Sequence, residues 1–313
     1  MADRMNLRGK DSRGMDQEIV LRTEPEENIP GFILGNALCP RCARPTPVND
    51  FMAGITPDPC ECDPPIPPGR HPVVQADSAE GTEVAICGAG PSLAQYKPFL
   101  RDFTGPIWGC NRGLNYLHEW GIPKAVGVAI DPSTRMFGQT WREPPDTEYL
   151  LATSVNPGLV WWLEHNERPI RYFHSMRGAK GETELYRMLY PPTVLAGHGL
   201  NVVNRAVDVA DYMGYTRIYL LGADNALGTD GAFYAGGERS PNEDQITLTG
   251  EIDGKSFETK TDMLMSAVEL VRRQQALKRE GKRLIFMGRT LPAALEGKTE
   301  AYLKRVIDWR DAV

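Results

Sequence analysis

The chain has 313 residues, a formal net charge of −6 and a sequence pI of about 5.5. This acidic balance argues against a surface coated with nucleic-acid-binding charge, but a local basic groove needs only a few residues, so nucleic acid is not excluded as a partner. No apolar run reaches the roughly 18 residues of a membrane span, and Met1–Arg22 has no signal-peptide core. We therefore expect a cytoplasmic protein without a membrane partner.

Four of the six cysteines lie in a segment, residues 38–72, that also holds ten prolines. They form two close pairs with seventeen residues between them, Cys39–Cys42 and Cys60–Cys62. Four thiolates at such spacing can bind one structural zinc ion. A segment with so few apolar core residues needs a bound metal ion of this kind to keep its fold. We predict a zinc module here. A proline-rich loop with free thiols is the alternative, and His71 in place of one cysteine is a weaker variant.

Composition divides the chain into three parts. Residues 1–37 show weak periodicity, so we expect an extended or partly ordered arm. Residues 38–72 form the predicted zinc module, and residues 73–313 form one main domain that is entered through a linker. Within that domain, Cys87 and Cys110 lie in apolar contexts and are expected to be buried free thiols.

The main domain opens on an apolar strand that runs into a glycine turn. Residues 84–87 precede Gly88-Ala89-Gly90, and Pro91-Ser92-Leu93 leads into a helical segment. Glycine lets the backbone approach a ligand closely, and the N–H groups of a helix's first turn attract phosphate. The turn therefore predicts a nucleotide-phosphate site, with a ligand-free tight turn as the alternative. No third glycine stands at the spacing of the dinucleotide fingerprint, which disfavours a redox cofactor.

Strand-like and helical segments alternate through the rest of the domain. We expect strands at 106–110, 125–131, 149–154, 170–174, 217–221 and 283–288, and helices at 95–102, 113–120, 201–213, 263–279 and 300–309. This order predicts an α/β fold with a Rossmann-like doubly wound sheet. Polar residues stand at several strand exits, namely Asn111, Asp131, Ser154, Asn156 and His174. Ligands bind beyond the carboxyl ends of such strands, so we expect these residues near one site.

Two further segments stand out in the second half of the chain. A glycine-rich loop at 228–237 carries Phe233 and Tyr234. A long loop of this kind is either a lid over the substrate or an ordinary surface loop. Asp253-Gly254 lies between two alternating segments and predicts a β-hairpin.

The order of these motifs resembles the MptE-like family, named for 6-hydroxymethylpterin diphosphokinases and including motility-associated glycosylation factors. The motifs are the turn at 86–93, Cys110-Asn111-Arg112, Asp131-Pro132, Gly222-Ala223-Asp224 and the Asp253-Gly254 hairpin. The front half is also similar to bacterial sialyltransferases around the Gly-x-Gly-Pro-Ser-Leu turn. The likeness covers about residues 83–295 and implies a nucleotide-dependent transferase.

The resemblance implies particular roles for the site residues. Those expected at the nucleotide are Gly88, Gly90, Pro91, Ser92, Leu93, Asn111, Arg112, Ser154, Asn156 and Asn201. Asp131 and Asp224 match acidic positions that can hold Mg²⁺, grip a ribose or act as a base. His174 is the first candidate for the histidine base of the sialyltransferases, and His198 is the second.

Three functions stay open from the sequence. The first is a glycosyltransferase that moves a sugar from a nucleotide-sugar to a hydroxyl acceptor, with a protein or a modified DNA base flipped into the pocket as candidate macromolecular acceptors. The second is an ATP- and Mg²⁺-dependent diphosphokinase acting on a hydroxymethylpterin-like molecule. The third is a non-enzymatic nucleotide-binding or assembly protein. The zinc module favours the first, because an added module suits a macromolecular acceptor.

Overall fold

A computed structural model describes residues 73–131, 147–175, 201–228, 231–237 and 247–307, together with short strands near the N-terminus and at 195–196. The cysteines of the predicted zinc module, Cys39, Cys42, Cys60 and Cys62, lie outside the described residues. So does His198. None of the helices in the described part of the chain has both the length and the apolar character that crossing a bilayer requires.

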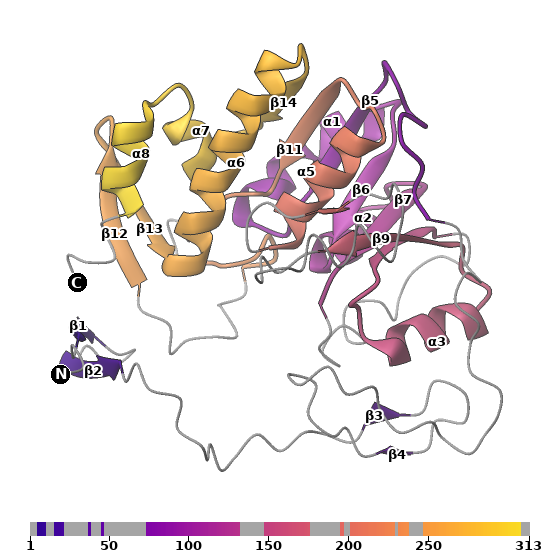
Figure 1. Cartoon of the computed structure of the whole chain (residues 1–313), viewed down its shortest axis with the longest axis horizontal. Coiled ribbons are helices and arrows are strands. Elements are labelled where there is room, and N and C mark those ends of the chain that lie inside the picture. The colour runs from indigo at the N-terminus through magenta and orange to yellow at the C-terminus, as the bar shows by residue number, and fades with distance from the viewer. Residues whose placement is uncertain are drawn as a thin grey trace.

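The main domain is built on a parallel sheet (Figure 1). Its eight strands lie in the order β10-β9-β8-β7-β6-β5-β11-β14, and β10 is a two-residue edge strand. Their bounds are β5 Glu83–Cys87, β6 Ile107–Cys110, β7 Ala125–Ala129, β8 Tyr149–Ala152, β9 Ile170–Ser175, β10 Leu195–Ala196, β11 Arg217–Leu221 and β14 Arg283–Phe286. The chain runs from β5 outward to β10, then returns to place β11 on the other side of β5. The predicted Rossmann-like fold is confirmed, and its switch point lies between β5 and β11.

Helices cover both faces of the sheet. They are η2 Pro91–Tyr96, α1 Lys97–Asp102, α2 Arg112–Glu119, α3 Pro157–His165, α5 Val202–Tyr212, α6 Thr261–Arg279, α7 Leu291–Leu295 and α8 Glu300–Ile307. Side chains of β5 alternate between two cores because successive strand residues point to opposite faces. Val84 and Ile86 pack with α5 and α6, whereas Ala85 and Cys87 pack with α1, α2 and α3. Cys87 and Cys110 are buried free thiols, as expected.

Two helices were not anticipated from the sequence. Asn156 caps α3 by accepting a hydrogen bond from the Gly158 N–H at 2.9 Å, and Pro157 fills the first helical position. Thr290 caps α7 in the same manner, through a bond from the Ala293 N–H. Both starts carry the cap-then-proline pattern that is typical of helix N-termini, so the signal was present in the sequence.

A β-hairpin extends the domain beyond β14. Strands β12 Thr247–Ile252 and β13 Lys255–Lys260 pair around Asp253 and Gly254, which both have positive φ, so the predicted hairpin is confirmed. The hairpin shares a third apolar core with α6, α7 and α8, and this group lies at the β14 side of the sheet (Figure 1). Its return into α6 brings the start of that helix to the carboxyl edge of the sheet.

The N-terminal arm and the start of the 38–72 segment also contain paired strands, which the sequence analysis did not predict. Strand β1 Met5–Lys10 pairs with β2 Asp16–Leu21, and β3 Ala37–Leu38 pairs with β4 Pro45–Thr46. The β1–β2 register places Met5 opposite Leu21 and Leu7 opposite Ile19. This cross-strand matching of apolar residues appears only when the two segments are compared with each other.

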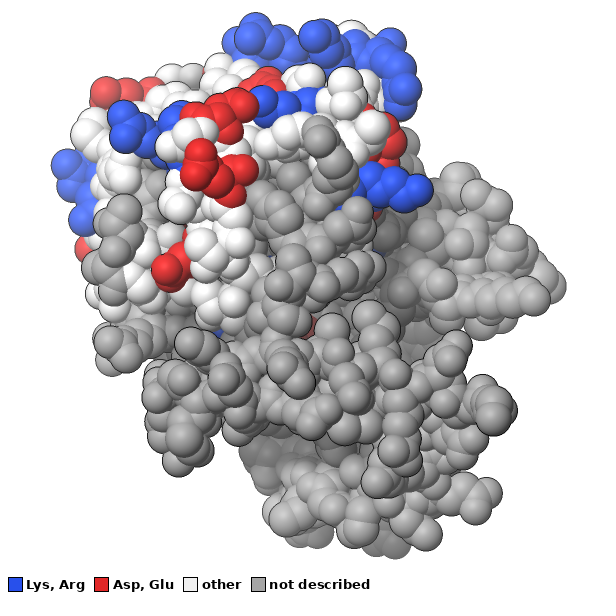
Figure 2. Space-filling model, turned by 90° about the vertical axis from the view of Figure 1, so that its left-hand side faces the viewer, with Lys and Arg blue, Asp and Glu red and all other residues white. Residues whose placement is uncertain are grey.

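Basic side chains gather where α6 ends and β14 begins (Figure 2, top). The exposed residues there are Lys278, Arg279 and Arg283. Lysine and arginine at the last turn of a helix complement the negative end of its dipole. Because β14 starts at Arg283, this patch lies at the amino edge of the sheet, away from the edge where ligands of doubly wound folds bind.

Candidate functional site

A pocket of about 290 Å³ opens at the switch point between β5 and β11. Its walls come from the glycine turn after β5, the start of α2, the start of α5, the residues after β11, the 231–237 segment and the first turns of α6. This volume is near the lower end of small-molecule sites, which span roughly 300–1,000 Å³. The pocket therefore lies where a doubly wound sheet binds its ligand.

The structure brings six of the predicted site residues together. Lining the pocket are Gly88, Gly90, Asn111, Arg112, Asn201 and Asp224. Ser92 lies behind the pocket wall and is hydrogen-bonded to Asp224, which forms part of that wall. Leu93 is fully buried in the core beneath η2. Pro91 begins η2.

The glycine turn is packed against the residues that follow β11. The N–H of Gly88 donates to Leu221 O and that of Gly90 donates to Gly222 O, both at 2.8 Å. A Cβ on Gly88 would lie 2.4 Å from Gly222 O, so no side chain fits there. Glycine is thus required here for the close approach of two backbone segments.

The Asp224 carboxylate lies at the start of η2, at the position where the sequence predicted an anionic phosphate. Its Oδ2 atom accepts hydrogen bonds from the Ser92 N–H at 3.1 Å and from Ser92 Oγ at 3.0 Å. A Cβ on Gly90 would lie 2.2 Å from the same oxygen. The Leu93 N–H donates to Gly90 O. A carboxylate of the protein therefore binds the Ser92 N–H, and phosphate binding at this turn stays a prediction.

The environment of Asp224 sets its charge state. Its side chain is 9% exposed, and burial raises the pKa of its carboxyl above the ordinary aspartate value. The hydrogen bonds from Ser92 oppose that rise, because they stabilise the ionised form. Its main-chain oxygen also accepts from the Leu291 N–H at 2.9 Å. Asp224 therefore ties three segments of the site together.

Asn111 is held in a strained backbone conformation at the pocket. It occupies the N-cap position of α2 with φ 48° and ψ −121°, and its side chain makes no capping bond. Its Oδ1 atom is buried without a hydrogen-bond partner among the described residues. Non-glycine residues keep such backbone angles chiefly where function or packing demands them. The side chain is thus held at the pocket and is not used to cap the helix.

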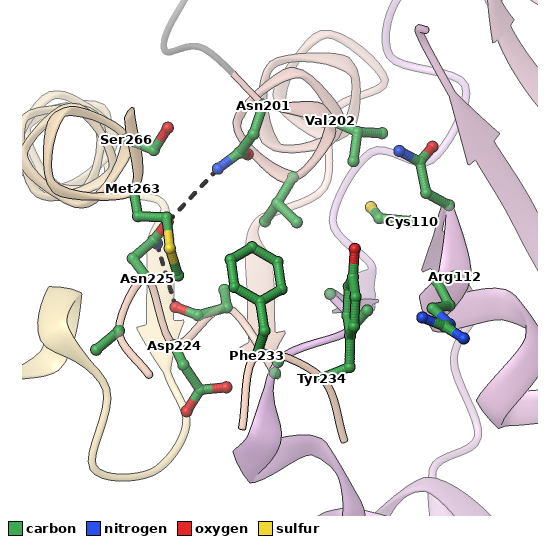
Figure 3. Close-up of a pocket in the computed structure, with 18 of the residues that line it drawn as sticks. Cys110, Arg112, Asn201, Val202, Asp224, Asn225, Phe233, Tyr234, Met263 and Ser266 are labelled. Atoms are coloured by element: carbon green, nitrogen blue, oxygen red, sulfur yellow. Dashed lines mark hydrogen bonds between the residues drawn. The ribbon is translucent and has the colours of Figure 1, made fainter. Parts of the chain in front are cut away.

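An aromatic pair closes one wall of the pocket (Figure 3). Phe233 and Tyr234 meet edge to face, with ring centroids 4.8 Å apart, and the Arg112 guanidinium lies 4.6 Å from the Tyr234 ring centroid. The segment that carries them is fastened to the glycine turn, since the Ala235 N–H donates to Ala89 O at 2.9 Å. The glycine-rich loop therefore contributes directly to the pocket wall.

The remaining predicted residues follow strands farther along the sheet and are not among the described residues that line this pocket. Asp131 follows β7, and its main-chain oxygen accepts from the Asn156 N–H at 3.4 Å. Asn156 caps α3, and Ser154 is half-buried beside it. His174 lies within β9, 3% exposed, with Nδ1 3.0 Å from Thr153 Oγ1. Burial lowers the pKa of the His174 imidazole, which favours its neutral form.

The sequence analysis missed the contribution of α6 and of the residue after Asp224. Asn225, Asp262, Met263 and Ser266 all line the pocket. Asn225 has φ 48°, a second strained position in this wall. The predicted hairpin was the available signal, because a hairpin that returns to the sheet edge delivers the next helix start to the same edge. Within the described residues, no three or more histidine, cysteine, aspartate or glutamate side chains cluster as metal ligands would.

The fold and this pocket define a Rossmann-like α/β protein with a ligand site at the switch point of its sheet. The chain belongs to the MptE-like family: the family model described as 6-hydroxymethylpterin diphosphokinase MptE-like matches residues 70–230. The resemblance inferred from the motifs is confirmed. No curated protein matches the chain.

Solved structures with a similar arrangement include two glycosyltransferases. The MAf glycosyltransferase from Magnetospirillum magneticum AMB-1 matches with a TM-score of 0.49 and 17% identity, over 78% of this chain and 39% of that one. The sialyltransferase CstII from Campylobacter jejuni, in complex with cytidine-5'-monophosphate, matches with a TM-score of 0.34 and 17% identity, over 70% of this chain and 85% of that one. This chain thus spans about two fifths of the MAf protein. At such identities and TM-scores, neither likeness indicates what this chain binds.

Proposed function

We propose that this protein is a nucleotide-dependent transferase that uses a nucleotide-activated sugar as donor and a hydroxyl group as acceptor. The observation that carries the proposal is the lining of the switch-point pocket. Its polar side chains include three neutral amides, from Asn111, Asn201 and Asn225, two carboxylates, from Asp224 and Asp262, and one arginine among the described lining residues. Amides suit the hydroxyl and ring edges of a nucleoside or a sugar, and one arginine suits a donor with little phosphate charge.

The proposed reaction places charge at the Arg112 end of the pocket. The acceptor oxygen forms a bond to the anomeric carbon of the sugar while the bond from that carbon to the phosphate oxygen breaks. Negative charge grows on the leaving phosphate, where a guanidinium stabilises it. Arg112 lies in the first turn of α2, the positive end of that helix, so side chain and helix dipole act in the same direction.

A base is needed to take the proton of the acceptor hydroxyl. Asp131, Asp224 and His174 stay predictions for this role. Of the two carboxylates that line the pocket in the described residues, Asp224 is buried and hydrogen-bonded to Ser92, whereas Asp262 is exposed. Asp262 Oδ1 accepts a hydrogen bond from the Met263 N–H, which fixes the carboxylate at the start of α6. Asp262 nevertheless lies at the α6 end of the pocket, opposite Arg112, whereas Asp131 follows β7, the strand that pairs with β6, and β6 leads into Arg112. We therefore place Asp131 first as the base.

A diphosphokinase is the second candidate, and the aromatic wall favours it. Phe233 and Tyr234 present rings on which a flat acceptor such as a pterin can stack, and the family description names that chemistry. In that reaction Asp262 would be a ligand of the Mg²⁺ ion that binds the donor phosphates. The structural zinc site predicted from the four cysteines is also still a proposal, to be tested by metal analysis of the purified protein.

Thermal shifts with a panel of ligands separate these functions. Nucleotide-sugars, their nucleoside phosphates and ATP are each added with and without Mg²⁺ to the full chain, to the Arg112→Ala variant and to Arg279→Ala, whose exposed side chain lies at the opposite edge. We expect a nucleotide-sugar or its nucleoside phosphate to raise the Tm of the full chain and of Arg279→Ala, but much less that of Arg112→Ala. A shift with ATP and Mg²⁺ alone would replace the sugar-transfer proposal with the diphosphokinase. No shift with any nucleotide would overturn both.

A further inference from the structure

The two ends of the pocket differ in chemical character. Figure 3 shows Asn201, Asn225, Met263 and Ser266 on one side and Arg112 on the other, with Phe233 and Tyr234 between them. The first end is formed by α5, α6 and the residues after β11. It carries the amides of Asn201 and Asn225 and the Ser266 hydroxyl, together with the carboxylates of Asp224 and Asp262, of which Asp224 is already bonded to Ser92. The second end carries the guanidinium. A ligand with an anionic end at Arg112 and an uncharged polar end at α6 matches this asymmetry, because the carboxylates disfavour a second anion at the α6 end.

A buried hydroxyl at the α6 end has no hydrogen-bond partner among the described residues. Ser266 is 1% exposed and lines the pocket, and its Oγ atom bonds to none of the described residues. Asn204, 2% exposed, donates from Nδ2 to Ser266 O at 3.1 Å, and its own Oδ1 is also without a partner there. Buried polar atoms nearly always find partners, because leaving one unpaired costs free energy. A ligand group bound at Ser266 would supply the missing bond.

The neighbouring amide groups of Asn201 and Asn225 can form hydrogen bonds with the edge of a flat ring. Asn201 Oδ1 accepts from the Asn204 N–H at 3.0 Å, which turns Asn201 Nδ2 toward Asn225 Oδ1, 3.5 Å away. That separation is at the limit of a hydrogen bond, so both atoms keep most of their bonding capacity. Together with Ser266 Oγ, this end offers both donors and acceptors, which is the pattern that a nucleobase edge requires.

Apolar surface beside these groups suits the face of the same ring. Met263 and Phe233 both extend into the pocket next to Asn225 (Figure 3). A thioether packs well against aromatic rings, and stacking of a base on an aromatic side chain tolerates any base. Stacking would therefore supply affinity, while Ser266 and the amides would supply discrimination.

We propose that the α6 end of the pocket is a base-recognition subsite in which Ser266 Oγ and the Asn201–Asn225 pair bind the edge of the donor's nucleobase, with the phosphate directed toward Arg112. This rests on the proposed function, because it assigns an orientation to the same nucleotide. It makes Ser266 a specificity-determining residue for the base and Arg112 a residue for the phosphate.

Isothermal titration of nucleoside monophosphates tests the assignment. The probes are CMP, UMP, AMP and GMP, with ribose 5-phosphate as the ligand that lacks a base. The proteins are the full chain, Ser266→Ala and the matched control Ser256→Ala, whose serine is exposed on β13. Alanine is a better helix former than serine, so Ser266→Ala is expected to fold.

We expect Ser266→Ala to weaken the preferred nucleotide about fivefold to tenfold, as one lost hydrogen bond does, and to change the Kd of ribose 5-phosphate less than about twofold. Ser256→Ala should match the full chain for every probe. Equal weakening of all probes, or no change for any, would overturn the subsite while leaving nucleotide binding intact. Failure of every nucleotide and nucleotide-sugar to bind the full chain would instead overturn the proposed function itself.

Discussion

The carboxylate of Asp224 binds both the N–H and the hydroxyl of Ser92, a residue 132 positions earlier in the chain. Through this contact the residues after β11 close over the turn after β5, and an internal anion takes the place that a phosphate takes in other glycine turns. The turn therefore shapes the pocket wall. The ligand's charge is left to other groups, of which Arg112 is the one that the described lining provides.

Replacing Asp224 by alanine should destabilise the fold. The change removes two hydrogen bonds to an ionised group and leaves the buried Ser92 N–H without its partner, which costs about 2–4 kcal/mol. Asp224→Asn should cost less, since both bonds go to Oδ2 and an amide oxygen at that position can accept both. Urea unfolding of both variants, of Ser92→Ala and of the double variant gives the coupling between the two side chains. A coupling energy near zero would contradict the role assigned to this pair.

Gly90→Ala should be among the most damaging substitutions in the turn. Its Cβ would meet Asp224 Oδ2 at 2.2 Å, so the carboxylate or the turn has to move, and we expect a loss of at least about 3 kcal/mol. Gly121→Ala is the control, because Gly121 has φ 68° and no heavy atom near its Cβ position. It should cost only about 1 kcal/mol, from backbone strain alone. Equal losses in denaturant unfolding would refute the steric argument.

Asn111→Gly should separate stability from binding. Glycine accepts φ 48° readily, so relief of backbone strain should stabilise the fold by about 1 kcal/mol. Loss of the amide should weaken nucleotide binding at least about fivefold. Lys124→Gly, at an exposed loop position with φ 53°, should give a comparable gain in stability without any change in binding. Asn111 would be only a turn residue if its variant bound nucleotide like the full chain.

The buried His174 should make stability depend on pH. Because burial lowers its pKa below the ordinary value of 6.5, the unfolded chain binds the proton more tightly than the folded chain. Its contribution to stability is thus complete above about pH 6.5 and is lost as the pH falls toward the folded value, by about 1.4 kcal/mol for each pKa unit of difference. Unfolding curves of the full chain and of His174→Gln between pH 5 and 8 should diverge in this direction. Parallel curves would contradict it.

Asp131→Asn should retain donor binding and lose transfer. A general base contributes about 10²- to 10⁴-fold to the rate, so turnover should fall within that range while the Kd of the donor changes little. Slow donor hydrolysis, measured as release of the nucleoside phosphate, reports turnover before the acceptor is known. Asp102→Asn, at an exposed position of α1, is the control and should leave both quantities unchanged. Full activity of Asp131→Asn would contradict its assignment as the base.

Seven of the eight strands of the sheet were predictable from the sequence because each is a short apolar run between turn signals, whereas the two-residue β10 was not predicted. The pocket was only partly predictable. Asn111 and Asp224 could be found, since each follows a strand and carboxyl ends of parallel strands share an edge. Ser266 could not, because it lies on a helix face like any core serine, and only the packing of α6 beside α5 turns it toward the pocket. The partner of the Ser92 N–H was also hidden, since it depends on a contact between distant segments.

A ligand-bound structure tests the central claim most directly. The full chain crystallised with the nucleoside phosphate that gives the largest thermal shift should show that ligand between β5 and β11. We predict its phosphate within hydrogen-bonding distance of Arg112, its base between Met263 and Phe233, and Asp224 still bound to Ser92. A nucleotide bound elsewhere, or one whose phosphate displaces Asp224 from the Ser92 N–H, would contradict the account.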